Sequence, residues 1–546
     1  MVWSRGIWLC VFAMFLLPSI GAAQTNRYMV FFKDKAGSSY SVNQPRLFLS
    51  DAALARRAQQ DISVVDADLP VNQSYVDGVR TAGASVFFST RWLNGVLVQC
   101  DAALVNTLSK LPYVDHLEYV APNAQLTKNG RTKSVLKTKS SKANDATQVQ
   151  LQMLGIDAMQ SSGYRGEGRT IAIFDSGFLG VNQTLPFHHL YLGNPGLVES
   201  TYDFVYNTDD VYRYDEHGTE VFSVIAAFQE GVFTGGAYNA VFHLYVTEDV
   251  GSEYRIEEYN WLFAAERADS AGVDMIHSSL GYYDFDDASM NYPKTAMDGK
   301  TTVITRAAQF AADRGIVVVC SAGNEGNVAW QMITAPADAV DVLSVANVNS
   351  SGQRVGSSSI GPSSDGRIKP DVAALGAGTS VIRPNGLVGT ASGTSLSAPL
   401  VTSLVAGVWE RYPFLTAREV IDAVRKSASL SQNPNNQIGY GIPNFKAVVN
   451  YLEVSGQENV FDIFPNPVSS GNQDTLTIRP RDPEEIASCR IEVLTSSGRQ
   501  LYDSQIGFSW LNRSHQTSLR ELAPGIYFLR ITWGEGRRGI YRIVRQ

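Results

Sequence analysis

The chain has 546 residues, enough for three or four domains of about 150 residues each. Hydrophobic residues make up 44% and charged residues 18%, a composition that lets the chain bury a sizeable core and excludes a disordered polyelectrolyte. The 45 basic and 53 acidic side chains give a net charge of −8, so the chain has no excess of positive charge with which to bind nucleic acid or an anionic membrane.

The N-terminus has the pattern of a secretory signal peptide. Arg5 is followed by an uncharged apolar run from Ile7 to Leu17 and then by small residues that end at Ala23. The run is too short to cross a bilayer of about 30 Å, and no later segment has the roughly 18 consecutive apolar residues of a transmembrane helix. We therefore expect residues 1–23 to be removed on export and the mature protein to have no transmembrane segment.

The cysteines predict no disulfide framework. They are few and lie in four separate regions of the chain, at Cys10, Cys100, Cys320 and Cys489. We expect them to be small buried hydrophobic side chains.

Residues 24–121 predict a small α+β domain. Strands are expected at 27–32, 85–90, 95–100 and 116–121, and helices at 50–60 and 102–111. Residues 122–147 are rich in Lys, Ser, Thr and Asn and show no apolar period, which is typical of a linker that a protease can cleave.

Residues 148–452 alternate short apolar runs with helical patterns. Strands are expected at 170–174, 241–246, 273–279, 315–322 and 341–348, and helices at 257–272 and 301–314. Nearly continuous apolar strands separated by helices predict an α/β domain whose parallel sheet is covered by helices on both faces. Because ligands of such sheets bind beyond the carboxyl ends of the strands, catalytic side chains should lie just after strands.

Residues 458–546 have a different pattern. Strands here alternate apolar and polar residues, and Tyr527, Leu529, Ile531 and Trp533 fall on one face of a single strand. This period of two, with turn residues between the strands, predicts a β-sandwich.

Four polar residues occupy positions where this α/β domain should have its active site. Asp175 follows the first strand, His217 begins an apolar helix, and Asn324 follows the strand at 315–322. Ser395 lies in GTASGTSLSAPL (389–400), inside which another helix begins. Each residue alone is more often a turn or cap residue. Together they have the Asp, His, Ser chain order of subtilisin, with an amide donor between His and Ser.

Six segments in this order resemble the signature blocks of the subtilisin-like serine proteases across residues 148–452: IAIFDSG, HGTEV, SSLG (278–281), SAGNEG, GRIKPDVAALG (366–376) and GTSLSAP. The resemblance implies that Ser395 is the nucleophile, His217 its general base and Asp175 the residue that orients the imidazole. It also implies an oxyanion hole made by the Asn324 side chain and the Ser395 backbone N–H. Substrate would add a strand to Ser279, Leu280 and Gly281, with Ala322 and Gly323 walling the pocket for the residue before the cut.

The flanking regions resemble further parts of such enzymes. By position and element order, residues 24–121 resemble the inhibitor propeptide of subtilisins, a ferredoxin-like α+β domain, which implies a zymogen inhibited by its own propeptide. FDIFPNPVSS (461–470), SSGRQLY and LAPGIYFLRI resemble a type A sorting domain of type IX secretion. This implies export across the outer membrane by that machinery, to the medium or the cell surface.

The resemblance implies no cofactor in the chemistry. Calcium is a frequent structural ion in the family, but no ligand set stands out in this sequence. The expected activity is that of a secreted serine endopeptidase acting on proteins or peptides. Two alternatives stay open: a non-catalytic surface protein that uses the same fold to bind peptides, and a processing protease with one or two substrates. The complete set of Asp175, His217, Asn324 and Ser395 favours an active enzyme.

Overall fold

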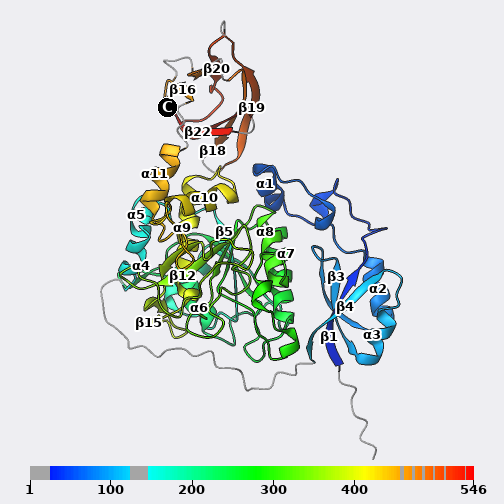
Figure 1. The fold of residues 1–546 in the computed structure, drawn as a ribbon. Helices are drawn as coiled ribbons and strands as arrows, with labels where there is room; N and C mark the ends of the chain where they lie inside the picture. Colours follow the sequence, from blue (N-terminus) through cyan, green and yellow to red (C-terminus); the bar gives the residue numbers. More distant parts are fainter. Residues whose placement is uncertain are drawn as a thin grey trace, which may run out of the picture.

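The computed structural model describes residues 25–122, 146–455, 460–469, 474–482, 486–495, 498–509, 512–534 and 537–546. The predicted signal peptide and most of the predicted linker lie outside these residues. The described chain forms an N-terminal α+β unit, a central α/β unit and a C-terminal β unit (Figure 1). Within the described ranges, no helix has both the length and the apolar content that crossing a bilayer requires.

The N-terminal unit is a four-stranded antiparallel sheet with two helices on one face. Its strand order is β2-β3-β1-β4, and the bounds are β1 (Thr25–Phe32), β2 (Ser85–Thr90), β3 (Gly95–Asp101) and β4 (Val114–Pro122). Helices α2 (Gln73–Thr81) and α3 (Ala102–Leu108) cover the face that includes Val30 and Val98. The predicted ferredoxin-like α+β fold is therefore confirmed. Helix α2 was not predicted, because it buries only Val76 and Val79 and contains Gly78.

The other face of this sheet packs on the central unit, beside α7 (Figure 1). Side chains alternate along a strand, so Met29 and Phe31 point away from Val30 and join an apolar cluster with Tyr259 and Phe263 of α7. The predicted helix at 50–60 is α1 (Asp51–Gln59), with Ser50 as its N-cap accepting from the Ala53 amide.

Buried ion pairs also join the two units. Asp269 of α7 is fully buried and accepts from three guanidinium groups of the N-terminal unit: Arg56 at 2.5 Å, Arg57 at 2.8 Å and Arg91 at 2.5 Å. Burial alone would raise the pKa of Asp269, but the charges of Arg56, Arg91 and Arg57 outweigh it and hold that pKa below its usual value. One buried carboxylate of the central unit is thus shared by three cations of the N-terminal unit.

The central unit is built on a seven-stranded parallel sheet in the order β13-β12-β11-β10-β5-β9-β6. The strands are β5 (Thr170–Asp175), β6 (Val198–Asp203), β9 (Val241–Val246), β10 (Met275–Ser278), β11 (Val317–Ser321), β12 (Leu343–Val348) and β13 (Val372–Leu375). The predicted α/β fold is confirmed. Edge strand β6 was not predicted, because VESTYD lacks the apolar run of an internal strand.

Helices cover both faces of this sheet. Ile171 and Ile173 of β5 pack with α6 (His217–Ala226) and α9 (Thr394–Arg411). Ala172 and Phe174, on the opposite face of the same strand, pack with α7 (Ile256–Ala271) and α8 (Val303–Ala312). The remaining helices are α4 (Gln148–Met153), α5 (Ile156–Ser161), α10 (Ala417–Ser427) and α11 (Phe445–Ser455), and two short hairpins are β7 (Phe228–Gln229) with β8 (Phe233–Thr234) and β14 (Thr379–Ile382) with β15 (Val388–Ala391).

The C-terminal unit has two facing sheets, ordered β16-β17-β20 and β19-β18-β21-β22. The first contains β16 (Phe461–Phe464), β17 (Thr475–Pro480) and β20 (His515–Ser518); the second contains β18 (Ser488–Thr495), β19 (Gln500–Gly507), β21 (Gly525–Trp533) and β22 (Arg537–Arg545). Leu529 and Ile531 lie fully buried in the shared core, as the alternation predicts, so the strands are consistent with a β-sandwich.

The three cysteines in the described residues, Cys100, Cys320 and Cys489, are buried free thiols, as expected. Cys10 lies outside the described residues.

Candidate active site

The predicted catalytic residues meet at the carboxyl edge of the parallel sheet. Asp175 is the last residue of β5, His217 the first of α6, and Ser395 the second of α9. Helices α6 and α9 pack against each other on the same face of the sheet. The fold thereby brings His217 and Ser395 to the same edge of the sheet as Asp175, although they lie 42 and 220 positions after it in the chain (217 − 175 = 42; 395 − 175 = 220).

The imidazole of His217 is held by Asp175. His217 Nδ1 lies 2.7 Å from Asp175 Oδ1, which also accepts from the Ser176 amide at 2.8 Å and the Ser176 hydroxyl at 3.1 Å. Asp175 is fully buried, whereas one third of the His217 side chain is exposed, at 33%. With its Nδ1 side facing a carboxylate, the ring carries its proton there and keeps Nε2 as the basic nitrogen.

This environment raises the basicity of His217. Burial alone would lower its pKa, but the charge of Asp175, the hydrogen bond to Asp175, and the charges of Glu248 and Asp215 outweigh burial and raise the pKa to about 9.

A glycine allows the helix to approach the aspartate. A Cβ on Gly218 would lie 2.3 Å from the carbonyl oxygen of Gly177 and 2.9 Å from the Cβ of Asp175. Any larger residue at position 218 would push the start of α6 away from the end of β5, and His217 could no longer form its hydrogen bond with Asp175.

The start of α9 is fixed by Asn324. Gly393 precedes the helix with φ +151, a conformation open to glycine. The Asn324 Oδ1 accepts from the Thr394 amide at 3.0 Å and from the Thr394 hydroxyl at 3.1 Å. Because both bonds fall on the oxygen, the donor side of this exposed amide is turned away from Thr394.

Pro399 lies inside α9, because the helix begins at Thr394 and Pro399 is its sixth residue. Proline has no N–H, so the carbonyl of Ser395, four residues earlier, loses its helical donor. The Ser279 hydroxyl donates to that carbonyl instead, at 2.9 Å. The predicted substrate segment and the predicted nucleophile are therefore directly linked.

A buried histidine extends this link. His277 Nε2 lies 3.0 Å from the Ser279 hydroxyl and its Nδ1 lies 2.8 Å from the hydroxyl of Thr402 in α9. Burial, together with the charge of His217, lowers the pKa of His277 to about 3, so the ring is neutral. The sequence did not identify His277, because it reads as one residue of an apolar strand.

The hydroxyl of Ser395 is also bonded to Ser279, through the backbone carbonyl of that residue. It donates to the Ser279 carbonyl at 3.3 Å, and the structure shows no hydrogen bond between it and His217 among the described residues. A rotation of this side chain has to precede proton transfer to the imidazole.

Three carboxylates near the site were also missed. Glu248, Glu253 and Glu257 each offer an oxygen, and the three oxygens lie within 4.8 Å of one another, a spacing that could hold a cation. They follow β9 and enter α7, without the spacing of a calcium loop that would have marked them in the sequence. Of the three, the charge of Glu248 contributes to raising the pKa of His217.

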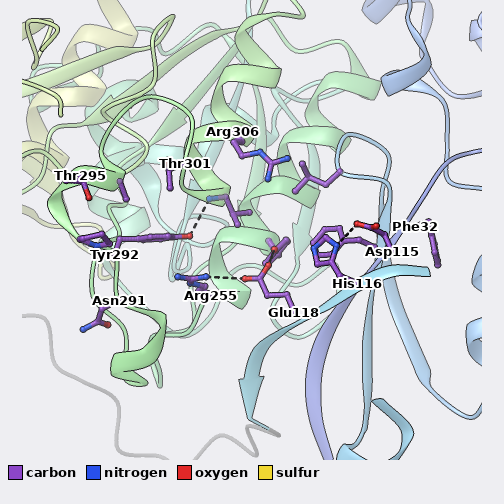
Figure 2. A pocket seen from close by; sticks show the side chains of 16 residues that line it. Phe32, Asp115, His116, Glu118, Arg255, Asn291, Tyr292, Thr295, Thr301 and Arg306 are labelled. Carbon is purple, nitrogen blue, oxygen red and sulfur yellow. Dashed lines mark hydrogen bonds and ion pairs between the residues drawn. The ribbon is translucent and has the colours of Figure 1, made fainter. Parts of the chain in front are cut away.

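A separate cavity of about 620 Å³ lies between the N-terminal unit and the central unit (Figure 2). Glu118 of β4 reaches Arg255 across it at 3.3 Å, and Asp115 pairs with His116 at 2.7 Å. No predicted catalytic residue lines this cavity, so it belongs to the domain interface.

Three family profiles match the chain. The Subtilase family matches residues 166–441, the Peptidase S8 propeptide domain of Bacteroidota matches residues 27–139, and the Secretion system C-terminal sorting domain matches residues 462–544.

The chain is also similar to characterised proteins and to a solved structure. Subtilisin NAT of Bacillus subtilis subsp. natto is 29% identical over 294 residues, which cover 53% of this chain and 68% of that protein. The subtilisin of Bacillus pumilus is 29% identical over 276 residues, covering 50% of this chain and 88% of that protein. The crystal structure of the epidermin leader peptide processing serine protease of Staphylococcus aureus superposes with a TM-score of 0.55 at 15% identity, over 78% of this chain and 98% of that one. The last likeness shows the fold alone.

The profiles together account for all three structural units. The sorting domain indicates export across the outer membrane by type IX secretion. The propeptide indicates synthesis as a zymogen. The chain belongs to the subtilase family and is a secreted serine endopeptidase made as a zymogen.

Proposed function

We propose that this endopeptidase cleaves protein and peptide substrates through Ser395, His217 and Asp175, with Asn324 completing the oxyanion hole. The observation that carries the proposal is the bond between His217 Nδ1 and the buried Asp175, at the sheet edge where Ser395 begins its helix. This bond leaves Nε2 free to take the Ser395 proton as the hydroxyl attacks the scissile carbonyl, and later to return it to the leaving amine.

The charge that develops on the substrate oxygen needs donors already in place. The side-chain amide of Asn324, held by Thr394 through its oxygen, and the Ser395 amide in the first turn of α9 would supply them. Substrate would bind as an added strand along Ser279, Leu280 and Gly281, with Ala322 and Gly323 on the opposite side of its pocket. The reaction needs no cofactor, because protein groups supply nucleophile, base and oxyanion donors.

This proposal is tested by labelling the purified, matured enzyme with a fluorophosphonate, which reacts with an activated serine. We expect wild type to be labelled at Ser395 and to cleave a peptide library, and an otherwise identical Ser395→Ala protein to do neither. Labelling that persists in the variant would refute Ser395 as nucleophile. The non-catalytic alternative is set aside because the chain is shown to be a protease; a broad and a narrow-specificity protease would share this mechanism.

The charge network around Asp269 makes a prediction about the zymogen. Asp269→Asn leaves Arg56 and Arg91 buried without their carboxylate, while Arg57 keeps Asp68 at 3.1 Å; breaking a buried pair in this way costs about 3–5 kcal/mol. We expect the propeptide to bind about 10²–10³-fold more weakly, since each 1.4 kcal/mol is about tenfold.

The measurement is the rate at which cleaved propeptide dissociates from the catalytic domain. It is made on Ser395→Ala protein whose linker at 122–147 has been cut by an added protease, so that the protein does not digest the released propeptide. Asp51→Asn is the matched control. Asp51 lies on α1, the helix that carries Arg56 and Arg57, but its ion pair with Arg46 is exposed, and such a pair contributes only about 0–1 kcal/mol. Equal dissociation rates for the two variants would contradict the role of the network.

A further inference from the structure

The side chain of Arg383 joins helix α6 to the β14–β15 hairpin. Arg383 follows β14 directly, where the hairpin turns. Its Nη1 donates to the Glu220 carboxylate and lies 3.6 Å from the Glu216 carboxylate, and its Nη2 donates to the Thr390 carbonyl at 3.0 Å. One guanidinium therefore bonds to the helix and to strand β15 at the same time.

On the helix side, the partners of Arg383 flank the proposed base. Glu216 is the N-cap residue of α6, His217 is its first residue, and Glu220 lies in its first turn. Residues four positions apart share one face of a helix, so Arg383 reaches both carboxylates from one side. The side chains of Arg383 and Glu220 are only 19% and 5% exposed, and water and salt therefore screen their attraction less than they screen that of a surface pair.

On the hairpin side, Arg383 is held against the strand that leads to the proposed nucleophile. Thr390 lies in β15, and the chain passes from the end of β15 to the start of α9, where Ser395 lies. Gly389 leaves room for the guanidinium, because a Cβ at that position would lie 2.7 Å from Arg383 Nε. The bond from Arg383 thus restrains the segment just before the nucleophile.

The buried carboxyl of Glu220 depends on Arg383 for its charge. Burial raises the pKa of Glu220 to about 7, and the charge of Arg383 acts in the opposite direction. Without the guanidinium this carboxyl would keep its proton to a higher pH. A second bond between the two elements, from the Ile382 amide to the Ser223 hydroxyl at 2.9 Å, lies further along α6 and restrains the middle of the helix more than its start.

Resting on the function proposed above, we propose that Arg383 is a positioning residue for proton transfer, which sets the separation of His217 and Ser395 by holding the start of α6 against β15. Proton transfer requires the donor and acceptor atoms to lie about 2.6–3.2 Å apart. The Ser395 hydroxyl reaches the imidazole only by rotating, so the position of the ring decides whether that rotation ends in a productive contact. A misplacement of about 1 Å can cost about 10²-fold in rate.

The test compares proteins matured by an added protease that cuts the linker at 122–147. Arg383→Met removes the guanidinium, and we expect kcat on a chromogenic peptide to fall about 10–100-fold. KM should change about threefold at most, because the proposed substrate segments at 279–281 and 322–323 follow other strands, β10 and β11. Arg383→Lys keeps the charge but lacks the planar fork that bonds to both elements, so it should recover part of the loss. Fluorophosphonate labelling counts active sites, so any loss from misfolding is divided out.

A double variant separates positioning from stability. Arg383→Met alone leaves Glu220 buried without this partner, and it should lower the midpoint of thermal unfolding of the fluorophosphonate-inhibited protein by about 5–10 °C. In Arg383→Met/Glu220→Leu an apolar pair replaces the ion pair, a change that is often neutral or stabilising, so the midpoint should return to within about 2 °C of wild type. We expect kcat to stay low, since the bond to β15 is still missing. A kcat that recovers together with the stability would make the role of Arg383 merely structural and would overturn the inference.

Arg425→Met is the matched control. Arg425 of α10 is 18% exposed, pairs with the buried Asp371 at 2.6 Å and donates to the Val342 carbonyl at 3.1 Å, so its bonds are of the same kind as those of Arg383. Asp371 directly precedes β13 and so lies at the amino edge of the sheet, whereas the proposed site lies at the carboxyl edge. We expect this variant to lose stability and to keep kcat within about twofold of wild type.

The outcomes distinguish this inference from the proposed function. An unchanged kcat in Arg383→Met, or an equal loss in Arg425→Met, would overturn the role of Arg383 and leave the catalytic mechanism intact. If wild type is neither labelled at Ser395 nor active on the peptide, the proposed function fails and this inference fails with it.

Discussion

Ser395→Ala is expected to lower kcat by about 10⁶-fold, the loss known for the nucleophile of subtilisin itself. Without the Ser395 oxygen no covalent acyl-enzyme can form, and the positioned imidazole of His217 has no proton to accept. Asn324→Ala should cost far less, about 10²–10³-fold as for an oxyanion donor of subtilisin, because the Ser395 amide still donates to the oxyanion.

Both losses are measured as single-turnover rates on a chromogenic peptide. Ser392→Ala is the matched control: this hydroxyl lies three residues before the nucleophile and accepts from the Gly378 amide at 2.8 Å, at an exposed position. It should change the rate by about twofold at most, the usual effect of a surface substitution. Equal losses in Ser395→Ala and Asn324→Ala would contradict the separate roles assigned to them.

Asp175→Asn is expected to lower kcat by about 10⁴-fold, the loss seen when the aspartate of a serine protease triad becomes an amide. The amide introduced at position 175 could donate to Nδ1 of His217, which would place the proton on Nε2 and remove the base. The two largest causes that raise the pKa of His217, the charge of Asp175 and its hydrogen bond, would disappear together.

The pH dependence separates this effect from simple damage to the fold. Catalysis requires neutral His217, so wild-type kcat/KM should rise with pH as the imidazole loses its proton, with a midpoint at about 9. In Asp175→Asn the pKa of His217 falls, and the rise should move to lower pH. Profiles of kcat/KM against pH for both proteins check this. A midpoint that stays in place in the variant would show that Asp175 does not control the imidazole.

Much of the fold could be predicted because it is encoded over short distances. The apolar run at 170–174 and the alternation in 525–533 each place a strand within a few residues, and both strands are found. The apolar pattern did not predict edge strand β6 or helix α2, because both elements are only partly buried. Neither has enough apolar residues to show a period.

The order of the motifs also predicted which residues would meet at the site, since strand ends of a parallel sheet share one edge. It could not predict their contacts. The bond between Ser279 and the Ser395 carbonyl depends on how deep Pro399 lies in α9, which is known only once the helix start is fixed. The cluster of Glu248, Glu253 and Glu257 depends on the turn from β9 into α7.

The sequence by itself determined the class of this protein and the strand and helix patterns of its three units, and it is the source of the proposed roles of Asp175, His217, Asn324 and Ser395. Only the tertiary structure decided what surrounds those residues, namely the neutral His277 behind Ser279, the shared carboxylate Asp269 under the propeptide, and Arg383 between the start of α6 and β15. The physical reason is distance along the chain. Periodicity acts within one element, whereas these contacts join elements whose relative position is set by packing of the whole sheet and its helices.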